Sequence, residues 1–317
     1  ALPPEAQVAL ALKTLCGFSP AEIAKAFLTS EAAIAKRLTR ARQRLQEKQV
    51  PFEIPSGDAL PDRLNNVLQT LYLLFNEGYK ASTGDHLVRE ELCQEAIRLA
   101  GHLVEHPLTN LPRTHALLAL MLLNAARLPA RTDSEGNILR LAEQDRSQWN
   151  KKMIARGMYH LTRSATGDEL SVYHLQAAIA GCHSAAANYA STDWPRILAM
   201  YDRLIELDAS PVAALNRAVA IAEVHGPQAG LAALNEIPGQ QSLKSYYLFY
   251  AVRAELESRL NNFETAAQHL RKAIALTEIK SEQSFLKRRL AECEAHDRGM
   301  TPSTINHQQQ KTPLCHT

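Results

Sequence analysis

The sequence predicts an all-α protein in which a helix-turn-helix domain is followed by a helical bundle and by tetratricopeptide-like helical hairpin repeats. Only 13 of the 317 residues are glycine, and alanine and leucine dominate with few β-branched clusters, which favours helices over strands. Long segments also place apolar residues three and four positions apart, as amphipathic helices do. The length of the chain favours two or three domains.

The first element is a group of three helical segments within residues 4–46. Gly17 ends the first segment. The second begins at residues 19–22, Ser-Pro-Ala-Glu, which is a capping box because a carboxylate follows the capping hydroxyl by three residues. Residues 28–30, Leu-Thr-Ser, form a turn whose hydroxyls can cap the third segment. Two short helices joined by a tight turn, the second of them basic, indicate a helix-turn-helix domain over residues 1–50.

The third helical segment separates an apolar stripe from a basic face. At about 100° per residue, one narrow side must face the other two helices. The residues on that side are Ile34, Leu38, Ala41 and Leu45. The opposite face has small residues near its start and long cations further along, which suits the major groove of DNA. The candidate DNA-binding residues are Ser30, Glu31, Ala32, Ala35, Lys36, Arg37, Thr39, Arg40, Arg42, Gln43 and Arg44.

The roles of these residues divide on physical grounds. Ala32, Ala35 and Lys36 lie near the start of the helix and are assigned to base edges or a thymine methyl group, whereas the arginines are assigned to phosphates. Over residues 1–50, Lys and Arg outnumber Asp and Glu eight to four, although the whole chain carries only +2. Such a local excess indicates a phosphate-bearing partner. The alternative is a solvated charged face of an ordinary amphipathic helix.

The remaining chain is predicted to be helical with a linker before it and a tail after it. Prolines and a glycine interrupt any period over residues 51–61, the linker. Residues 62–190 form an extension domain with five amphipathic segments: Asp62–Phe75, His86–Glu105, Pro112–Ala126, Gln148–Thr166 and Glu169–Ala190. Residues 191–295 repeat an apolar spacing first seen at Tyr201–Leu207, with a period near the ~34 residues of a tetratricopeptide unit. The tail, residues 296–317, is predicted to be disordered.

Two groups of polar residues in the extension allow two interpretations. They are either a buried structural hydrogen-bond network or the lining of a small-ligand pocket. Their members are Asn76, Glu77, Tyr79, Lys80, Arg131, Asp133, Asp145, Arg146 and Trp149. His102 and His106 stand one helical turn apart, but no third metal ligand is evident, so we interpret them as capping or surface residues. We predict no metal site and no cofactor.

Four short motifs occur together in residues 1–50. They are Leu-Pro at residues 2–3, Gly-Phe-Ser at 17–19, Glu-Ile-Ala at 22–24 and Lys-Arg-Leu-Thr-Arg-Ala-Arg at 36–42. This combination resembles region 4 of bacterial RNA polymerase sigma factors of the extracytoplasmic-function type. The resemblance implies binding to the minus-35 promoter element and to the flap of the polymerase β subunit. The family usually has a glycine in the turn where this chain has Leu28.

Three motifs beyond the linker extend the resemblance. They are Tyr-Leu-Leu-Phe-Asn-Glu-Gly-Tyr at residues 72–79, Arg-x-Asp at 131–133 and Gln-Asp-Arg-Ser-x-Trp at 144–149. They resemble the tetratricopeptide-like C-terminal extension of a subgroup of these sigma factors, which implies that the extension governs activity. We also expect the extension to dock on region 4. The family's region 2 would precede Ala1, so we expect this chain to be a fragment that does not start transcription alone.

Several classes of protein are disfavoured by the sequence. It contains no Walker loop, dinucleotide fingerprint, nucleophile elbow or zinc-protease motif, and its five scattered cysteines indicate reduced thiols and a cytoplasmic protein. The longest apolar run, Ala116–Leu123, is too short to span a membrane. The predicted function is therefore that of a non-enzymatic sigma factor. The alternatives are a tetratricopeptide-type interaction scaffold without DNA binding, and an enzyme whose pocket includes Glu77 and Asp145.

Overall fold

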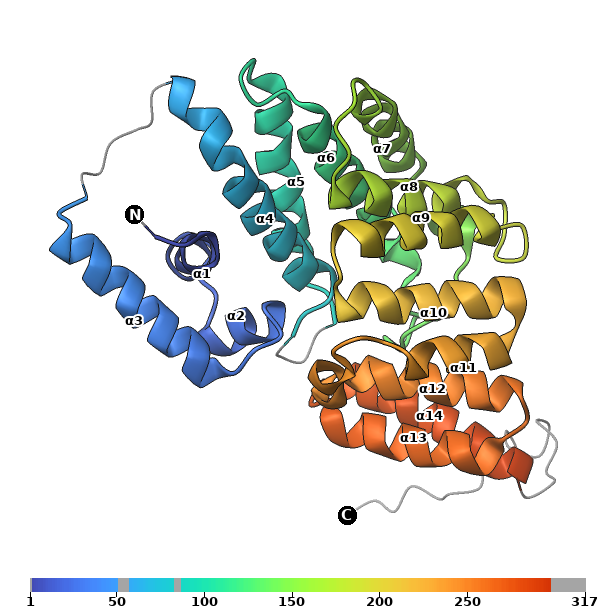
Figure 1. Cartoon of the computed structure of the whole chain (residues 1–317). Coiled ribbons are helices and arrows are strands. Elements are labelled where there is room, and N and C mark those ends of the chain that lie inside the picture. The colour runs from blue at the N-terminus through green and yellow to red at the C-terminus, as the bar shows by residue number, and fades with distance from the viewer. Residues whose placement is uncertain (1, 51–56, 83–86, 298–317) are drawn as a thin grey trace, which may run out of the picture. The chain divides into compact units, whose positions relative to one another are not determined.

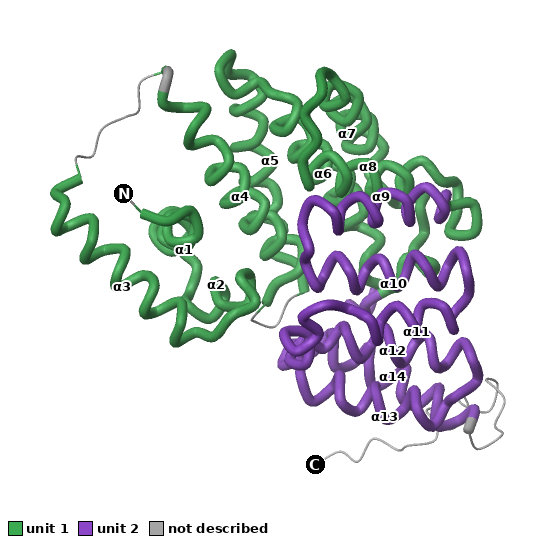
Figure 2. Tube along the Cα trace, viewed as in Figure 1, with its two compact units in different colours: residues 1–133, 139–192 green, residues 134–138, 193–317 purple. Residues whose placement is uncertain are grey.

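The computed structural model describes residues 2–50, 57–82 and 87–297 (Figure 1). Within these ranges the regular elements are helices and none is a β-strand, so the all-α prediction is confirmed. The chain divides into two compact units, which are coloured separately in Figure 2. Unit 1 contains residues 1–133 and 139–192, and unit 2 contains residues 134–138 and 193–317.

Three helices open unit 1: α1 (Pro4–Thr14), α2 (Pro20–Ala26) and α3 (Glu31–Glu47). The capping box predicted for α2 is present. The Glu22 amide donates to Ser19 Oγ at 3.1 Å, and the Ser19 amide donates to Glu22 Oε2 at 2.6 Å. Gly17 lies in the left-handed region with a φ of 74°, where a side chain would be strained. The sequence thus sets the local geometry at the start of α2, where the chain leaves α1.

Five longer helices complete unit 1: α4 (Leu60–Tyr79), α5 (Glu90–Glu105), α6 (Pro112–Ala125), α7 (Lys151–Ser164) and α8 (Val172–Ala185). Helix α4 starts before and ends after the predicted segment, because Pro61 fits its first turn and Phe75 is followed by the buried Glu77 and Gly78. Gln148 belongs to a separate 3₁₀ turn, η3 (Arg146–Gln148). Two further short turns are η1 (Gly57–Ala59) and η2 (Leu128–Ala130).

One hydrophobic core joins the first three helices of unit 1 to α4, α5 and α6. Val8, Leu12 and Ile34 belong to the same buried cluster as Leu68 of α4 and Leu118 of α6. Helix α6 is buried over most of its circumference, which accounts for its continuous apolar sequence. Residues 1–50 and the first helices of the extension therefore bury their apolar surface in common.

Unit 2 is an array of helices in which each packs on its neighbour in the chain. The helices are α9 (Trp194–Leu207), α10 (Pro211–His225), α11 (Pro227–Asn235), α12 (Tyr247–Arg259), α13 (Phe263–Leu276) and α14 (Lys280–Asp297), with a 3₁₀ turn, η4 (Gln240–Ser245). The repeated apolar positions Leu204 and Leu270 are buried, whereas Leu207 is 44% exposed. Successive helices of the array pair as hairpins, and their assignment to tetratricopeptide-like repeats stays a prediction.

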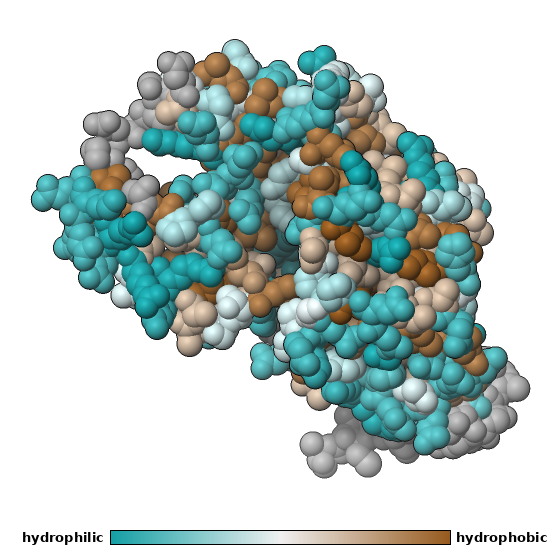
Figure 3. Space-filling model, viewed as in Figure 1, coloured by the Kyte–Doolittle hydropathy of each residue, from teal (hydrophilic) through white to brown (hydrophobic). Residues whose placement is uncertain are grey.

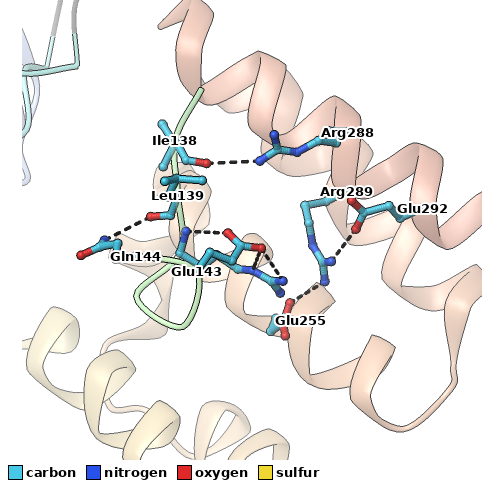
Figure 4. Close-up of polar contacts among 9 residues, drawn as sticks. Ile138, Leu139, Glu143, Gln144, Glu255, Arg288, Arg289 and Glu292 are labelled. Carbon is cyan, nitrogen blue, oxygen red and sulfur yellow. Dashed lines mark hydrogen bonds and ion pairs between the residues drawn. The ribbon is translucent and has the colours of Figure 1, made fainter. Parts of the chain in front are cut away.

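Ion pairs reinforce unit 2 at its last helix (Figure 4). Arg289 of α14 donates to Glu255 of α12 at 2.7 Å and to Glu292 at 2.6 Å. Arg288 donates to the main-chain oxygen of Ile138 at 3.2 Å. These contacts tie both α12 and the segment 134–138 to α14.

The predicted linker and tail lie partly outside the described residues. Of the linker, 51–56 are not described, and the part that follows is occupied by η1 and the start of α4. Of the tail, residues 298–317 are not described. No helix in the described part of the chain combines the length and apolar character needed to cross a bilayer.

Candidate nucleic-acid interface

The inner side of α3 is the apolar stripe that the sequence predicted. Ile34 is completely buried, and Leu38 and Ala41 are 4% and 3% exposed. Leu45, the last member of the stripe, is half-buried. Because this stripe contacts α1 and α2, it fixes which side of α3 faces outward.

The outer side of α3 is a row of exposed residues that begins with small side chains and continues with cations. Glu31, Ala32, Ala35 and Lys36 are exposed over the first two turns, and Thr39, Arg40, Arg42, Gln43 and Arg44 are exposed over the last turns. The outer side appears hydrophilic at the left of the view in Figure 3. Lys36, Arg40, Arg42 and Arg44 form no ion pair with any described residue. Their charges therefore remain available to a polyanion.

Three polar residues of the predicted set have partners within α3. Ser30 caps the helix, since its Oγ accepts from the Ala33 amide at 3.2 Å. Thr39 Oγ1 donates to the Ala35 carbonyl at 3.0 Å, and Gln43 Nε2 donates to Glu47 Oε1 at 2.8 Å. The cap holds the start of α3, where the exposed side of the helix begins.

Arg37 differs from the other arginines of α3. It is half-buried, its Nη2 lies 2.8 Å from Glu5 Oε2 of α1, and its guanidinium lies 5.5 Å from the centre of the Phe27 ring. These contacts hold α3 against α1 and α2. This role was not predictable from the sequence, because the pairing of Glu5 with Arg37 depends on how the helices cross.

The turn between α2 and α3 contains an unusual backbone conformation. Leu28 has a φ of 50° and is 44% exposed. The left-handed region costs an L-residue about 1–2 kcal/mol relative to the right-handed helix. Leu28 is thus held in the conformation that glycine would adopt without strain, at the position where the sequence analysis noted a missing glycine.

Contacts between the first helices and the extension involve α1 and α2. Arg89 Nη1, just before α5, lies 3.1 Å from Glu22 Oε1 of α2. Lys25 Nζ donates to the Ser82 carbonyl at 2.6 Å, and Asn66 of α4 donates to Gln7 of α1 at 3.0 Å. The outward cations of α3 take no part in these contacts. The extension therefore packs against the helix-turn-helix without occupying its basic face.

The polar residues near the end of α4 form a hydrogen-bond network. Glu77 Oε1 accepts from the Ser82 amide at 2.9 Å, and burial raises the pKa of this carboxyl. Arg131 donates to the Tyr79 carbonyl and its guanidinium lies 4.0 Å from the centre of the Tyr79 ring. Asn76 and Lys80 belong to the same end of α4. Lys80 and Asp133 each take part in a non-covalent contact, so neither is without a partner. These contacts are those expected of a structural hydrogen-bond network, which is one of the two interpretations of these polar residues.

The polar residues around η3 have structural partners of their own. Asp145 caps η3 by accepting from the Ser147 amide at 2.9 Å. Hydrogen bonds from the Ser147 hydroxyl and then from the Ser147 amide lower the pKa of Asp145. Arg146 donates to the carbonyls of His183 and Ala186, each at 2.6 Å, and lies 4.7 Å from the centre of the buried Trp149 ring. Arg146 thereby satisfies carbonyls at the end of α8.

The two histidines considered as metal ligands have other surroundings. His102 Nε2 lies 3.0 Å from Arg98 Nη1, and His106 Nδ1 accepts from the Leu108 amide at 3.3 Å. Within the ranges that the structure describes, no group of three or more His, Cys, Asp or Glu side chains could hold a metal ion.

Comparisons with known proteins assign both parts of unit 1 to families. Residues 1–45 match the family described as sigma-70, region 4. Residues 63–165 match a family of unknown function, DUF6596. An uncharacterized protein of Rhizobium meliloti (strain 1021) is 36% identical over 311 residues, which cover 98% of this chain and 72% of that protein. No solved structure matches. The resemblance of the N-terminal residues to sigma region 4 is confirmed, and the assignment of the remainder stays a prediction.

Proposed function

The chain belongs to the family of the Rhizobium meliloti protein, and we propose that it acts as a sigma-factor-like DNA-binding protein whose α3 lies in the major groove of promoter DNA. The observation that carries this proposal is the outer side of α3. Four exposed cations, which have no carboxylate partner among the described residues, stand on a helix that the region 4 match includes for most of its length. We assign the groove to the minus-35 element, as in the sigma factors of extracytoplasmic-function type that the sequence resembles.

In the proposed complex, different residues of α3 contact the bases and the phosphates. Small side chains at Ala32 and Ala35 allow the backbone to approach base edges, whereas Arg40, Arg42 and Arg44 reach phosphates. Arg37 supports this surface from behind through Glu5. We further propose that the domain binds the flap of the polymerase β subunit, and that the extension governs activity through the core that it shares with α1–α3.

The test of DNA binding replaces two outward cations of α3. The double variant Lys36→Ala, Arg40→Ala should bind duplex DNA more than tenfold more weakly, and the slope of log affinity against log salt should shrink by about one, since Arg40 is the phosphate contact of the pair and each phosphate contact contributes about 0.9. The measurement is fluorescence anisotropy with a duplex selected from random sequence by the intact chain, over a series of salt concentrations.

A matched control is available in unit 2. The double variant Arg196→Ala, Lys287→Ala also removes one arginine and one lysine, both exposed, and should bind DNA as the unaltered chain does. Equal binding by the α3 variant and the unaltered chain would contradict the proposal and favour an interaction scaffold without DNA binding.

A further inference from the structure

Helix α7 of the extension carries a second concentration of positive charge. Its 14 residues include Lys151, Lys152, Arg156 and Arg163, and none of the 14 is Asp or Glu. A helix of an ordinary soluble domain mixes both signs of charge on its exposed side. The composition of α7 therefore calls for a physical explanation.

The cations of α7 line up on one side of the helix. At 3.6 residues per turn, Lys152, Arg156, Tyr159 and Arg163 fall within an arc of about 60°, and the row is about 16 Å long. We call these four residues the α7 row. The opposite side of the helix contains Gly157 and Ser164, which are buried, and α7 packs on α6 by that side. The α7 row consequently points away from the core of unit 1.

Every member of the α7 row is exposed, and none of its cations has a carboxylate partner among the described residues. The acidic residues nearest in the chain are Asp145, Asp168 and Glu169. Asp145 caps η3, and Glu169 Oε1 is paired with Arg113 at 2.7 Å. Asp168 is an exposed residue of the loop after α7. None of these three carboxylates forms an ion pair with a cation of the row among the described residues.

The pKa of a histidine beside the row is affected by two of the row's cations. His160 of α7 lies between the row and the core, and its Nδ1 is 2.8 Å from Nδ1 of His115 on α6. Burial lowers the pKa of His160 to about 4, with further contributions from His115, Arg156 and Arg163. Two guanidinium groups therefore act together on this part of the helix.

Tyr159 stands within the row with 60% of its surface exposed. Its ring meets the His160 ring edge to face at 5.1 Å, and its hydroxyl has no hydrogen-bond partner in the described part of the chain. A tyrosine hydroxyl is one of the side-chain donors that bind phosphate oxygens. The row thus offers three cations and one neutral donor along a straight line.

We propose that the α7 row is a second DNA-contacting surface, which binds the phosphate backbone of duplex DNA without reading its sequence. A row of about 16 Å spans roughly five base-pair steps of 3.4 Å each. A phosphate backbone suits the row because it presents a continuous negative line, which matches three cations spaced along one side of a helix without any carboxylate among them. The inference rests on the proposed function, since α3 would bring the chain to DNA.

The experiment removes the three cations of the row together. The variant Lys152→Ala, Arg156→Ala, Arg163→Ala should bind long duplex DNA on the order of tenfold more weakly. The slope of log affinity against log salt should shrink by about three times the 0.9 that one phosphate contact contributes. A charge-keeping variant, Lys152→Arg, Arg156→Lys, Arg163→Lys, should bind nearly as the unaltered chain does. Tyr159→Phe should weaken binding and leave the salt slope unchanged, because it removes a neutral donor.

Two controls make the result specific. The variant Arg196→Ala, Lys244→Ala, Lys287→Ala removes three exposed cations of unit 2 and should leave binding unchanged. Circular dichroism should show the same helix content and melting temperature for every variant, as expected for changes at exposed positions. If the triple variant of α7 unfolds, a photo-crosslinking residue in place of Tyr159 tests the contact directly, and crosslinking to DNA is expected.

The outcomes separate this inference from the proposed function. If the α7 variant keeps the affinity and the salt slope of the unaltered chain while the α3 variant loses them, the second surface does not exist and the proposed function stands. If crosslinking at Tyr159 yields only protein adducts in the presence of DNA and polymerase, the row binds an acidic protein and the inference is wrong. If neither the α3 nor the α7 variant changes DNA binding, both proposals are wrong.

Discussion

Leu28, in the turn between α2 and α3, is a non-glycine residue with a left-handed backbone. Its φ of 50° places a side chain where glycine carries no penalty. The sequence indicated the departure at this position, since the related family has a glycine there. It could not indicate whether the turn would change shape or keep its shape at a cost. In the structure Leu28 itself adopts the positive φ, so the surrounding helices must enforce it.

The strain at Leu28 predicts an unusual order of stability among variants. Leu28→Gly should be more stable than Leu28→Ala by about 1 kcal/mol, because both variants lose the same packing and only glycine relieves the positive φ. Urea unfolding followed by circular dichroism measures the difference. Leu15 is the control, since it is 83% exposed with a φ of −102°. There Gly should be no more stable than Ala, and the same preference for Gly at both positions would refute the argument.

The outward or inward position of the residues of α3 was largely predictable, with Arg37 as the exception. The spacing of Ile34 and Leu38 fixed the inner side of α3, and the outward position of Lys36 and Arg40 followed. The role of Arg37 did not follow, because Glu5 is 32 positions away in the chain and meets it only when α1 crosses α3. Periodicity places a residue on a face, but it cannot find a partner on another helix.

At the scale of helices, the sequence predicted which elements exist better than where they begin. Proline marks the first turns of α1, α2, α4 and α6, and such starts were found within two residues. The start of α5 was predicted too early, at His86, which lies outside the described residues, because apolar spacing carried on through Leu87. Leu87 is buried through tertiary contacts and not through membership of the helix.

Close packing of α6 and α7 depends on Gly157. A Cβ at this position would lie 2.7 Å from Cγ and 2.9 Å from Cδ2 of Leu123, which is completely buried. Gly157→Ala should therefore destabilise unit 1 by about 1–3 kcal/mol through overpacking, less the gain of up to about 1 kcal/mol that alanine brings to a helix. Thermal unfolding measures the sum of the two effects.

Gly101 of α5 supplies the matched control for Gly157. It is also a helical glycine, but nothing lies within 4 Å of the position a Cβ would take. Gly101→Ala should therefore stabilise the protein by about 0.5–1 kcal/mol through helix propensity alone. Equal effects at the two glycines would show that α6 and α7 can separate without cost, and that close approach does not explain Gly157.

At the scale of the whole molecule, the main feature that the sequence did not reveal is the extent of the first core. Composition marked residues 51–61 as a linker, and the extension was expected to dock on region 4, but neither prediction indicated that the two parts share one apolar core. In the structure, Leu12 and Ile34 share a buried cluster with Leu68 of α4. The composition of a linker predicts the backbone conformation of the linker itself. It does not predict whether the surfaces on either side are apolar enough to pack together.

The shared core predicts that damage to the extension reaches the DNA-binding helices. Leu68→Ala removes a completely buried side chain of α4 and should cost about 2–5 kcal/mol of stability. If region 4 and the first helices of the extension form one cooperative unit, amides of α1 and α3 should lose protection from hydrogen exchange together with those of α4. DNA affinity should fall as well, although Leu68 contacts none of the outward cations.

A cavity of similar size in unit 2 tests whether this effect is specific. Leu215 of α10 is 1% exposed and belongs to the separate core of unit 2. Leu215→Ala should lower protection in α10–α13 and leave α1 and α3 as they are. If Leu68→Ala left the exchange of α1 and α3 unchanged, the two parts of unit 1 would be energetically independent. The extension would then have no route through the core to the reading helix, and its influence on activity would have to pass through a separate partner.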